Sequence, residues 1–575
     1  MSEPVASKPA PKPDSGDAGG ATIPFKLILV TLCLAQFINA YDTTAMNVAV
    51  TSVVKSLDTT VAGVQAALVI YSLVMAAFML TGGKLGDIWG RRSTFLIGVG
   101  MYGVGAAITA VSPSLPVMVF GWSLLEGLGS ALMIPAIYAI IGSSFPAGKV
   151  RLSAFAAVGA IAAMGAALGP LVCGFLTTYL SWRVSFALEV VVVLVVIALT
   201  MRIKVPRVPR PKVQLDYVGS LLSALGLALV VLGPLLAGRY GWIAAREPVI
   251  FFKAQVIAKG GISPVFPFVI AGVVVLGAFA LWEHARDKAS KPMLLDIKMF
   301  GQRTVLFGLF AILALMFMQA GFLFVAPVFM QIALGYSAFH SGLLILPMTV
   351  AIILVASQVS KLTQIVAPKL LIQIGMLTFS AGIVLVAMEL KATASQWDFL
   401  PGMIVSGVGI GLITAPLMNM TQGAVVQDEQ SEISGLSRSV SNLGGAFGTA
   451  VAGAILISTL IGSMAVQVDR FPGISAAEKS IVVAAVTKDA ETVSNSQLQT
   501  YLKSKGDAPS LAAKFVAFNQ TARNKGLQEA LLAIGLIGLF GFVASCFLPG
   551  GKTKPEATEV TGGPAPAASR NAQRA

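Results

Sequence analysis

Apolar runs of twenty or more residues recur along almost the whole chain, and they constrain its fold more than any other feature. In lipid such a run must be a helix, because its backbone N–H and C=O groups find no water and have to pair within the segment. Hydrophobic residues make up 56% of the 575, and charged residues only 11%. A soluble protein of this length would need far more charge on its surface. The sequence therefore predicts an all-α integral membrane protein.

We expect fourteen transmembrane helices and both termini in the cytoplasm. Short loops on the predicted inner side carry most of the Lys and Arg residues, and this asymmetry sets the orientation. The same distribution argues against nucleic acid as a partner of a chain with net charge +14, because the basic residues form no dense block. The expected spans are 25–54, 61–81, 93–112, 116–142, 152–179, 184–203, 217–238, 264–283, 304–333, 340–360, 370–389, 399–421, 436–463 and 527–548.

Paired glycine motifs indicate an internal repeat. Gly127-Leu128-Gly129 in the fourth span recurs as Gly407-Val408-Gly409 in the twelfth, and Gly165 and Gly169 recur at nearly the same offset as Gly444 and Gly448. Parallel repeats of this kind form a cavity at their interface. The predicted division is a six-helix half at 24–203, two additional helices at 204–303 and a second six-helix half at 304–548. Disordered cytoplasmic tails are expected at 1–23 and 549–575.

Two predicted outer segments stand apart from the spans. Residues 464–526 are polar, and we expect a helical hairpin over the outer face, with a capping box at Ser475–Glu478 and a second cap at Ser510. A substrate lid is the alternative. The loop 239–263 contains the apolar run Val249–Phe252, which either forms a strand or lies at the membrane interface.

A glycine-rich segment with paired arginines, Gly83–Arg92, joins the second and third spans. Its glycines permit a tight turn, and Asp87 can cap the next helix or pair with a cation. This spacing resembles the signature of the major facilitator superfamily, although Ile88 stands where a basic residue is usual. The resemblance implies the major facilitator fold and a gating latch at the inner face, unless the arginines only set the topology. The gating residues would be Gly83, Asp87, Gly90, Arg91 and Arg92.

The fifth span carries Gly165-x-x-x-Gly169-Pro170-x-x-Cys173-Gly174. Small residues four apart let helices approach closely, and proline removes a backbone hydrogen bond. The motif resembles the antiporter signature of proton-coupled drug exporters, with Cys173 in place of one glycine. The resemblance implies exchange of a compound for protons, and generic helix packing is the alternative. The antiporter-motif residues would be Gly165, Gly169, Pro170 and Gly174.

An aspartate, Asp42, lies deep in the first span, roughly 24 Å along the helix from Lys26. An ionised carboxylate in lipid is costly, so Asp42 is a candidate for proton exchange rather than a hydrogen-bonded structural residue. The run Asp42–Asn47 resembles the Asp-x-Thr-x-x-Asn element of the fourteen-helix drug:proton antiporter family.

Two further acids stand where that family has other residues. In the fourth span Ser123 replaces the usual arginine and Glu126 lies near the midplane, and in the sixth span Glu189 replaces an asparagine. Without the arginine, Glu126 is expected to carry a proton alongside Asp42 and Glu189. The competing interpretation is that Glu126 pairs with a distant cation and is structural.

The substrate cavity is expected between the first, second, fourth and fifth spans and their C-terminal counterparts. Aromatic and Met side chains can accept varied apolar compounds, and acids can attract cations. Ordinary packing between helices is the alternative for each candidate. The candidates are Phe37, Tyr41, Met46, Trp122, Ser130 and Met133.

The sequence therefore predicts a monomeric, proton-coupled exporter of small hydrophobic or cationic compounds, working by alternating access in a bacterial cytoplasmic membrane. We expect no enzyme activity, metal or cofactor. The nucleotide-like pattern Gly98–Gly103 lies inside a span, and the three Cys and two His residues suggest no site. An exporter of one endogenous lipid or metabolite is an alternative, as is a non-transporting sensor or scaffold. The buried acids argue against a scaffold, which gains nothing from their desolvation.

Overall fold

The computed structural model describes residues 25–146, 148–203, 215–251, 254–289, 291–332, 334–390, 394–425, 430–469 and 509–550. Within them, fourteen helices are long and apolar enough to cross a membrane, and the predicted number of spans is confirmed. The single-helix spans are α1 (Phe25–Ser56), α2 (Val61–Trp89), α3 (Arg91–Ala110), α6 (Lys149–Tyr179), α7 (Trp182–Arg202), α8 (Tyr217–Tyr240), α9 (Val265–Lys288), α10 (Arg303–Ile332), α11 (Ala338–Ile365), α12 (Pro368–Met388), α13 (Leu400–Gln422), α14 (Gln430–Asp469) and α17 (Pro509–Cys546).

The fourth span is composite. It begins as α4 (Leu115–Met118), continues as a π-helix, η1 (Val119–Glu126), and returns to α-helix in α5 (Gly127–Ser144). A π-helix is rare and occurs mostly as a single turn at a functional position. The remaining short elements are a 3₁₀-helix, η2 (Ile297–Gly301), and the antiparallel strands β1 (Val249–Phe251) and β2 (Ala254–Ile257). The apolar run in the loop 239–263 therefore begins as a strand.

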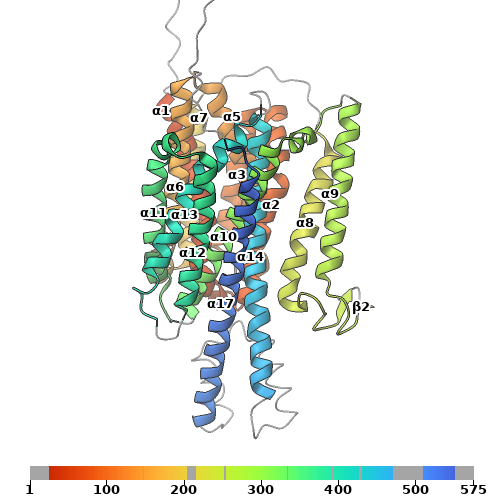
Figure 1. Cartoon of the computed structure of the whole chain (residues 1–575). Helices are drawn as coiled ribbons and strands as arrows, with labels where there is room; N and C mark the ends of the chain where they lie inside the picture. Colours follow the sequence, from red (N-terminus) through yellow and green to blue (C-terminus); the bar gives the residue numbers. More distant parts are fainter. Residues whose placement is uncertain are drawn as a thin grey trace, which may run out of the picture.

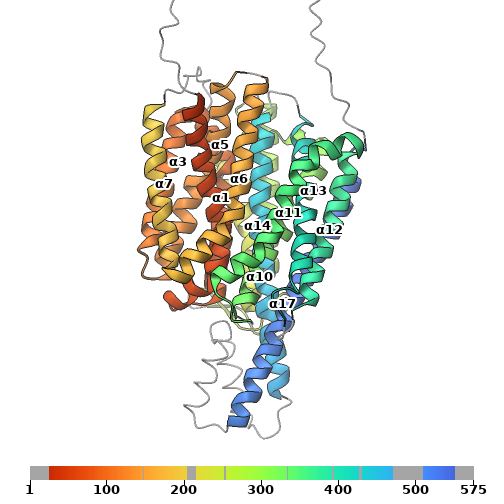
Figure 2. The ribbon, with the colours of Figure 1, turned by 90° about the vertical axis from the view of Figure 1, so that its left-hand side faces the viewer.

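The helices form two groups with a separate pair at one side. Figure 2 shows α1, α3, α5, α6 and α7 in one group and α11, α12 and α13 in the other, with α10 and α14 between them. The pair α8–α9 stands beside the bundle in Figure 1. Val231 of α8 is buried against Val69 and Leu73 of α2 and against Ala446 and Ala450 of α14. Because α2 and α14 belong to different predicted halves, α8 covers the seam between them.

The packing of glycines supports the internal repeat. A Cβ atom at Gly165 of α6 would lie 2.6 Å from the carbonyl oxygen of Phe37 in α1. A Cβ atom at Gly444 of α14 would lie at the same distance from the carbonyl oxygen of Leu313 in α10. These separations leave no room for a side chain, so α6 approaches α1 in the way that α14 approaches α10.

The second span is longer than expected. Residues Gly83–Trp89 continue α2, and the turn to α3 is limited to Gly90, whose φ of 94° favours glycine. Gly90 occupies the N-cap position of α3 and no side chain caps that helix, so the predicted capping role of Asp87 is wrong.

The thirteenth and fourteenth spans also extend beyond their expected ends. In Figures 1 and 2, α14 and α17 protrude from the bundle, away from the end at which α1 begins. Ser510 lies in the first turn of α17, which runs without a break into the last span. Of the predicted outer hairpin at 464–526, the structure describes only 464–469 and 509–526, where α14 and α17 continue as helices. The capping box Ser475–Glu478 and the tail residues 1–23 and 551–575 lie outside the described residues.

Candidate functional site

Three acidic side chains from three spans meet inside the first helix group. Asp42 lies in α1, Glu126 at the end of η1 and Glu189 in α7, and each is at most 1% exposed. One carboxylate oxygen from each residue lies within 4.8 Å of the others. We call these three residues the acidic cluster. The sequence indicated each acid separately, and the fold brings them together.

Aromatic residues donate hydrogen bonds to this cluster. The indole Nε1 of Trp122 lies 2.9 and 3.1 Å from the two carboxylate oxygens of Asp42. The hydroxyl of Tyr102 donates to Glu189 Oε2 at 2.7 Å. The ring of Tyr71 stacks on Trp122 with the centroids 5.0 Å apart, and the Tyr71 hydroxyl lies 3.5 Å from the hydroxyl of Ser130. Buried aromatic rings that carry a polar hydrogen are suited to this combination of packing and donation.

The second oxygen of Glu126 and that of Glu189 have no such donor. Within the described residues, Glu126 Oε2 and Glu189 Oε1 are buried and lack any hydrogen-bond partner. The other Glu126 oxygen accepts only a long bond, at 3.5 Å, from the hydroxyl of Thr109. These two carboxylate oxygens can be satisfied by a proton, by a water molecule or by another cation.

No basic side chain balances the cluster in the part of the chain that the structure describes. The ion pairs there join residues of loops and helix ends, such as Arg239 with Glu247 and Arg286 with Asp216. The distant cation considered for Glu126 is thus absent from the described residues. Ionising all three acids would place three like charges in one desolvated site, so positive charge has to enter from solution. The spacing would also let the three oxygens share a cation, without any contribution from histidine or cysteine.

The π-helix places two residues of this site. Trp122 and Glu126 both belong to η1, and both are fully buried. A π-helix holds more residues per turn than an α-helix, so it rotates the side chains that follow relative to the regular α4 and α5 segments. Ser123, which stands where the family resemblance leads us to expect arginine, donates to the carbonyl of Ala67 in α2 at 2.8 Å. Its side chain therefore links two helices and adds no cation to the site.

The candidate cavity residues differ in their surroundings. Ser130 accepts a hydrogen bond from Asn39 at 2.8 Å, and Tyr41 shares one of 2.5 Å with Ser185. Met46 is 2% exposed within the main hydrophobic cluster. Phe37 is partly exposed, and its ring stacks on that of Tyr41.

Met133 and Trp122, two of the candidate cavity residues, are fully buried in this structure. Met133 is fully buried in a hydrophobic cluster with Phe95, Val99 and Tyr102, so it packs in the core rather than on an open cavity. Trp122 is equally buried, and its indole nitrogen donates a hydrogen bond to Asp42. It therefore contacts the acidic cluster rather than an open cavity. Neighbouring helices also cover Ser130, which is fully buried.

The antiporter-like motif lies between the acidic cluster and the second helix group. Gly169 of α6 packs on Thr44 and on the carbonyl of Tyr41, the residue before Asp42. The carbonyl of Pro170 lies against Gly342 of α11, and a Cβ atom at Gly174 would come within 2.7 Å of the Ala338 carbonyl in α11. One helix thus contacts both the helix of Asp42 and a helix of the other group.

Two of the predicted gating residues, Arg91 and Arg92, bind the ends of helices in the first group. Arg91 Nη1 donates to the carbonyl of Ala139 at 2.9 Å, and Arg92 Nη2 donates to the carbonyl of Thr200 near the end of α7 at 3.2 Å. Asp87 interacts with the charges of Arg91 and Lys84. Cations near helix carboxyl ends are electrostatically favourable, so both arginines fasten the ends of neighbouring helices.

A contact between the two predicted six-helix halves was missed at the sequence level. Arg438 of α14 donates to the hydroxyl of Tyr138 in α5 at 2.6 Å, and its guanidinium lies 5.5 Å from the centre of that ring. Arg438 forms no ion pair within the described residues. Arg438 stands two turns inside α14. A charge inside an apolar span is the signal that could have identified it.

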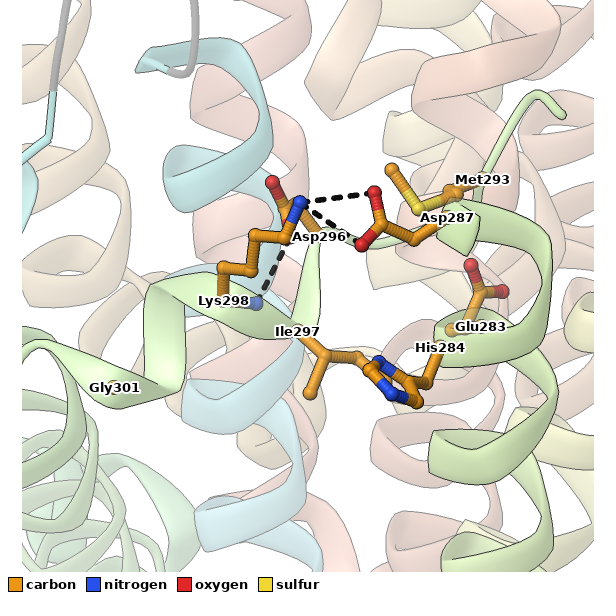
Figure 3. A pocket seen from close by; sticks show the side chains of 8 residues that line it. All are labelled: Glu283, His284, Asp287, Met293, Asp296, Ile297, Lys298 and Gly301. Atoms are coloured by element: carbon orange, nitrogen blue, oxygen red, sulfur yellow. Dashed lines mark hydrogen bonds and ion pairs between the residues drawn. The ribbon is translucent and has the colours of Figure 1, made fainter. Parts of the chain in front are cut away.

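A separate cavity of about 300 Å³ lies at the end of α9 where that helix leads to η2. Figure 3 shows its lining side chains, with Lys298 reaching Asp287 across it. The Nζ–Oδ2 distance is 2.9 Å, and this hydrogen bond and charge raise the pKa of Lys298. Glu283 Oε2 accepts the backbone N–H of Leu294 at 3.0 Å. These contacts fasten the connection between α9 and α10, and the cavity contains no residue of the acidic cluster.

The amino-acid sequence of this chain is similar to those of known membrane transporters. The sequence family described as the Major Facilitator Superfamily matches residues 32–449. A probable actinorhodin transporter from Streptomyces coelicolor is 27% identical over 466 residues, which cover 79% of this chain and 76% of that protein. The cephamycin export protein CmcT of Amycolatopsis lactamdurans is 29% identical over 426 residues, covering 74% and 83%. The multidrug resistance protein Stp of Mycobacterium tuberculosis is 25% identical over 445 residues, covering 77% and 78%.

Solved structures agree in fold. A bacterial homologue of the human lysosomal transporter Spinster, in an inward-facing and unoccupied conformation, matches with a TM-score of 0.59. The match covers 92% of this chain and 98% of that one at 13% sequence identity. At this identity the likeness concerns the arrangement of the helices alone.

Proposed function

The chain belongs to the Major Facilitator Superfamily, and on this premise we propose that it exports small hydrophobic or cationic compounds in exchange for protons. The observation that carries the proposal is the convergence of Asp42, Glu126 and Glu189 without a basic partner among the described residues. Desolvated acids of this kind mark proton relays in transporters. The similarity to proteins named for antibiotic export and multidrug resistance supports the direction of transport.

Protons can be coupled to the movement of helices through α6. Charging Asp42 changes the forces on α1, and Tyr41, its neighbour in sequence, is in direct contact with Gly169 of α6. The next residue of α6, Pro170, contacts Gly342 of α11. A displacement of α1 would therefore reach the second helix group through one closely packed helix, because such contacts transmit shifts rather than absorb them.

The moving units in this proposal are residues 24–203 and 304–548, with 204–303 as an accessory pair. Both termini lie in the cytoplasm, because the basic loops are concentrated on that side. Pro24 and Gly550, each replaced by cysteine in a protein without its own three cysteines, test the orientation. Both should be protected from a membrane-impermeant maleimide in intact cells, and labelling from outside would reverse the topology.

The decisive experiment is transport by purified protein in proteoliposomes under an imposed pH gradient. The substrates tested are a lipophilic cation, a neutral hydrophobic antibiotic, a β-lactam and a phospholipid. We expect transport of at least one compound that stops when an uncoupler collapses the gradient. Transport that continues unchanged with the uncoupler would remove proton coupling from the proposal, and transport of no compound would favour a sensor or scaffold.

The breadth of the substrate range defines a second candidate function. Two of the similar proteins are named for a single natural product each, whereas a third is named for resistance to many drugs. An exporter of one endogenous lipid or metabolite is therefore the alternative within the same family. Competition among the four compounds separates the two, because a broad exporter shows mutual inhibition and a specific one does not.

A further inference from the structure

An apolar groove of about 820 Å³ lies beside the strand pair at the end of α8 and α9. Its walls come from Ile243 before β1, from Val256 and Ile257 in β2, from Ile262, and from Phe266 and Ile270 in the first turns of α9. All of its lining side chains are apolar. Figure 1 shows the strand pair at the end of the α8–α9 pair, apart from the main bundle. We call this feature the hairpin groove.

The groove is a built feature and not a gap beside a loose loop. The backbone N–H of Ala245 donates to the carbonyl of Gly261 at 2.7 Å, and that of Gly260 donates to the carbonyl of Ala245 at the same distance. The buried hydroxyl of Ser263 donates to the carbonyl of Gly241 at 2.6 Å. These bonds join the segment that follows α8 to the segment that precedes α9, so the two walls hold their separation.

The walls of the groove present apolar side chains outward. Ile243 is 76% exposed, Ile262 is 70% exposed and Val256 is 64% exposed. Exposed apolar groups gathered in one place mark a contact with a partner or a membrane. Phe266 and Ile270 belong to the membrane-spanning part of α9, and Val273 and Val274 of the same helix are also exposed. The groove therefore continues the lipid-facing surface of α9.

Positive charge borders this apolar surface. Lys259 follows Ala258, which lines the groove, and Arg246 follows Ala245, whose backbone pairs with Gly260 and Gly261. Both side chains are exposed, and neither forms an ion pair within the described residues. The nearby acid Glu247 is already paired with Arg239. The hairpin groove is thus apolar, and the segments that form it carry two exposed basic residues. This combination suits a lipid with a negatively charged headgroup.

We propose that the hairpin groove binds one phospholipid with an anionic headgroup, its acyl chain against Val256, Ile262 and Ile270 and its phosphate beside Lys259 and Arg246. In the proposed orientation this is a lipid of the outer leaflet. The bound lipid would hold the α8–α9 pair at the membrane surface while α8 covers the seam between α2 and α14. The inference does not depend on what the protein transports.

Native mass spectrometry of the purified protein with equal amounts of phosphatidylglycerol and phosphatidylcholine tests the headgroup. Wild-type protein should retain phosphatidylglycerol preferentially. Lys259→Gln and Arg246→Gln should each reduce that retention about fivefold, the effect of one basic residue near an anionic lipid. Lys55→Gln, which removes an exposed charge from a different connection at the same end of the bundle, is the matched control and should change nothing. Equal retention of both lipids, or equal effects of all three variants, would overturn the proposal.

Quenching by brominated lipid tests the position of the acyl chain. Val256 is mostly exposed, so Val256→Trp adds an indole to the groove without removing a core side chain. Its added emission should be quenched more strongly by brominated phosphatidylglycerol than by brominated phosphatidylcholine in bilayers of equal bromine content. The same substitution at Glu247, in the same loop but outside the groove, should show no such preference. Absence of any preference at position 256 would place the retained lipid elsewhere and reject the groove as its site.

Discussion

The indole nitrogen of Trp122 lies 2.9 and 3.1 Å from the two carboxylate oxygens of Asp42, so one N–H is shared by both oxygens. This N–H favours the charged form of Asp42 in a site where desolvation opposes it. The π-helix that carries Trp122 also carries Glu126, and any change in its winding would move both residues together. The local helix geometry thus links the hydrogen-bond donor of one acid to the position of another.

Trp122→Phe should reduce proton-driven transport about tenfold or more, because a hydrogen bond to a charged group contributes roughly 1.5–3 kcal/mol. The Phe ring keeps most of the stacking on Tyr71, so the protein should still fold. Transport is measured in proteoliposomes as a function of pH, and the pH dependence should shift as well as the rate. Trp182→Phe is the matched control, because Trp182 is equally buried but its indole nitrogen has no partner within the described residues. Equal effects of the two substitutions would mean that Trp122 contributes through packing and not through its hydrogen bond to Asp42.

Glu126→Gln, Asp42→Asn and Glu189→Gln should each abolish accumulation driven by a pH gradient while substrate binding survives. Each substitution removes one of three like charges that have no basic partner in the described residues, so the melting temperature should hold or rise. A structural ion pair would show the opposite, a loss of stability when one partner is neutralised. Melting temperature and transport are measured on the same preparations. If Glu126→Gln transports normally at every pH, its role as a carrier is rejected and Asp42 becomes the leading candidate.

Gly169→Ala should lower stability by about 1–3 kcal/mol, the usual effect of inserting a methyl group into a closely packed interface. The added Cβ atom would overlap the Thr44 hydroxyl and approach the Tyr41 carbonyl to within 2.8 Å. Gly159→Ala, on the same helix but with nothing within 4 Å of the added atom, serves as the control and should be tolerated. Thermal unfolding in detergent measures both. A tolerated Gly169→Ala would mean that α1 and α6 can separate freely.

Asp87→Asn and Arg91→Ala should slow the transport cycle with little change in expression or substrate binding, because both residues lie where α2 meets α3, which is the cytoplasmic end in the proposed orientation. Arg91→Ala loses its bond to the Ala139 carbonyl, and Arg91→Lys should restore part of the rate. Turnover is compared with equilibrium binding for each variant. Parallel loss of binding and folding would show that these residues support the structure rather than the gate.

Arg438→Gln should impair transport by removing a contact between the two predicted six-helix halves, the bond from its guanidinium to the Tyr138 hydroxyl. Tyr138→Phe deletes the same bond from the other side but retains the ring beneath the cation. If the hydrogen bond matters, the two single variants and the double variant should have nearly equal effects, as in a double-mutant cycle. Additive losses would mean that the residues act independently.

The sequence by itself determined the class, the number of spans and the individual acids. Apolar runs of membrane-spanning length have few alternatives to a helix, because lipid offers no partner to an open backbone. Asp42, Glu126 and Glu189 were each recognisable, because a carboxylate in such a run is costly and therefore rarely incidental. The glycine pairs at Gly165 and Gly444 likewise predicted close helix contacts, which the structure confirms.

Only the tertiary structure decided which of these residues meet. The three acids converge only if α1, α7 and η1 are rotated about their own axes so that these side chains face one another. Packing against neighbouring helices sets that rotation. A segment that is apolar on all sides gives no sequence signal for it. For the same reason neither the burial of Met133 nor the link from Arg438 to Tyr138 was foreseen. The π-helix is likewise a product of packing, because no residue pattern in Val119–Glu126 distinguishes it from the α-helix on either side.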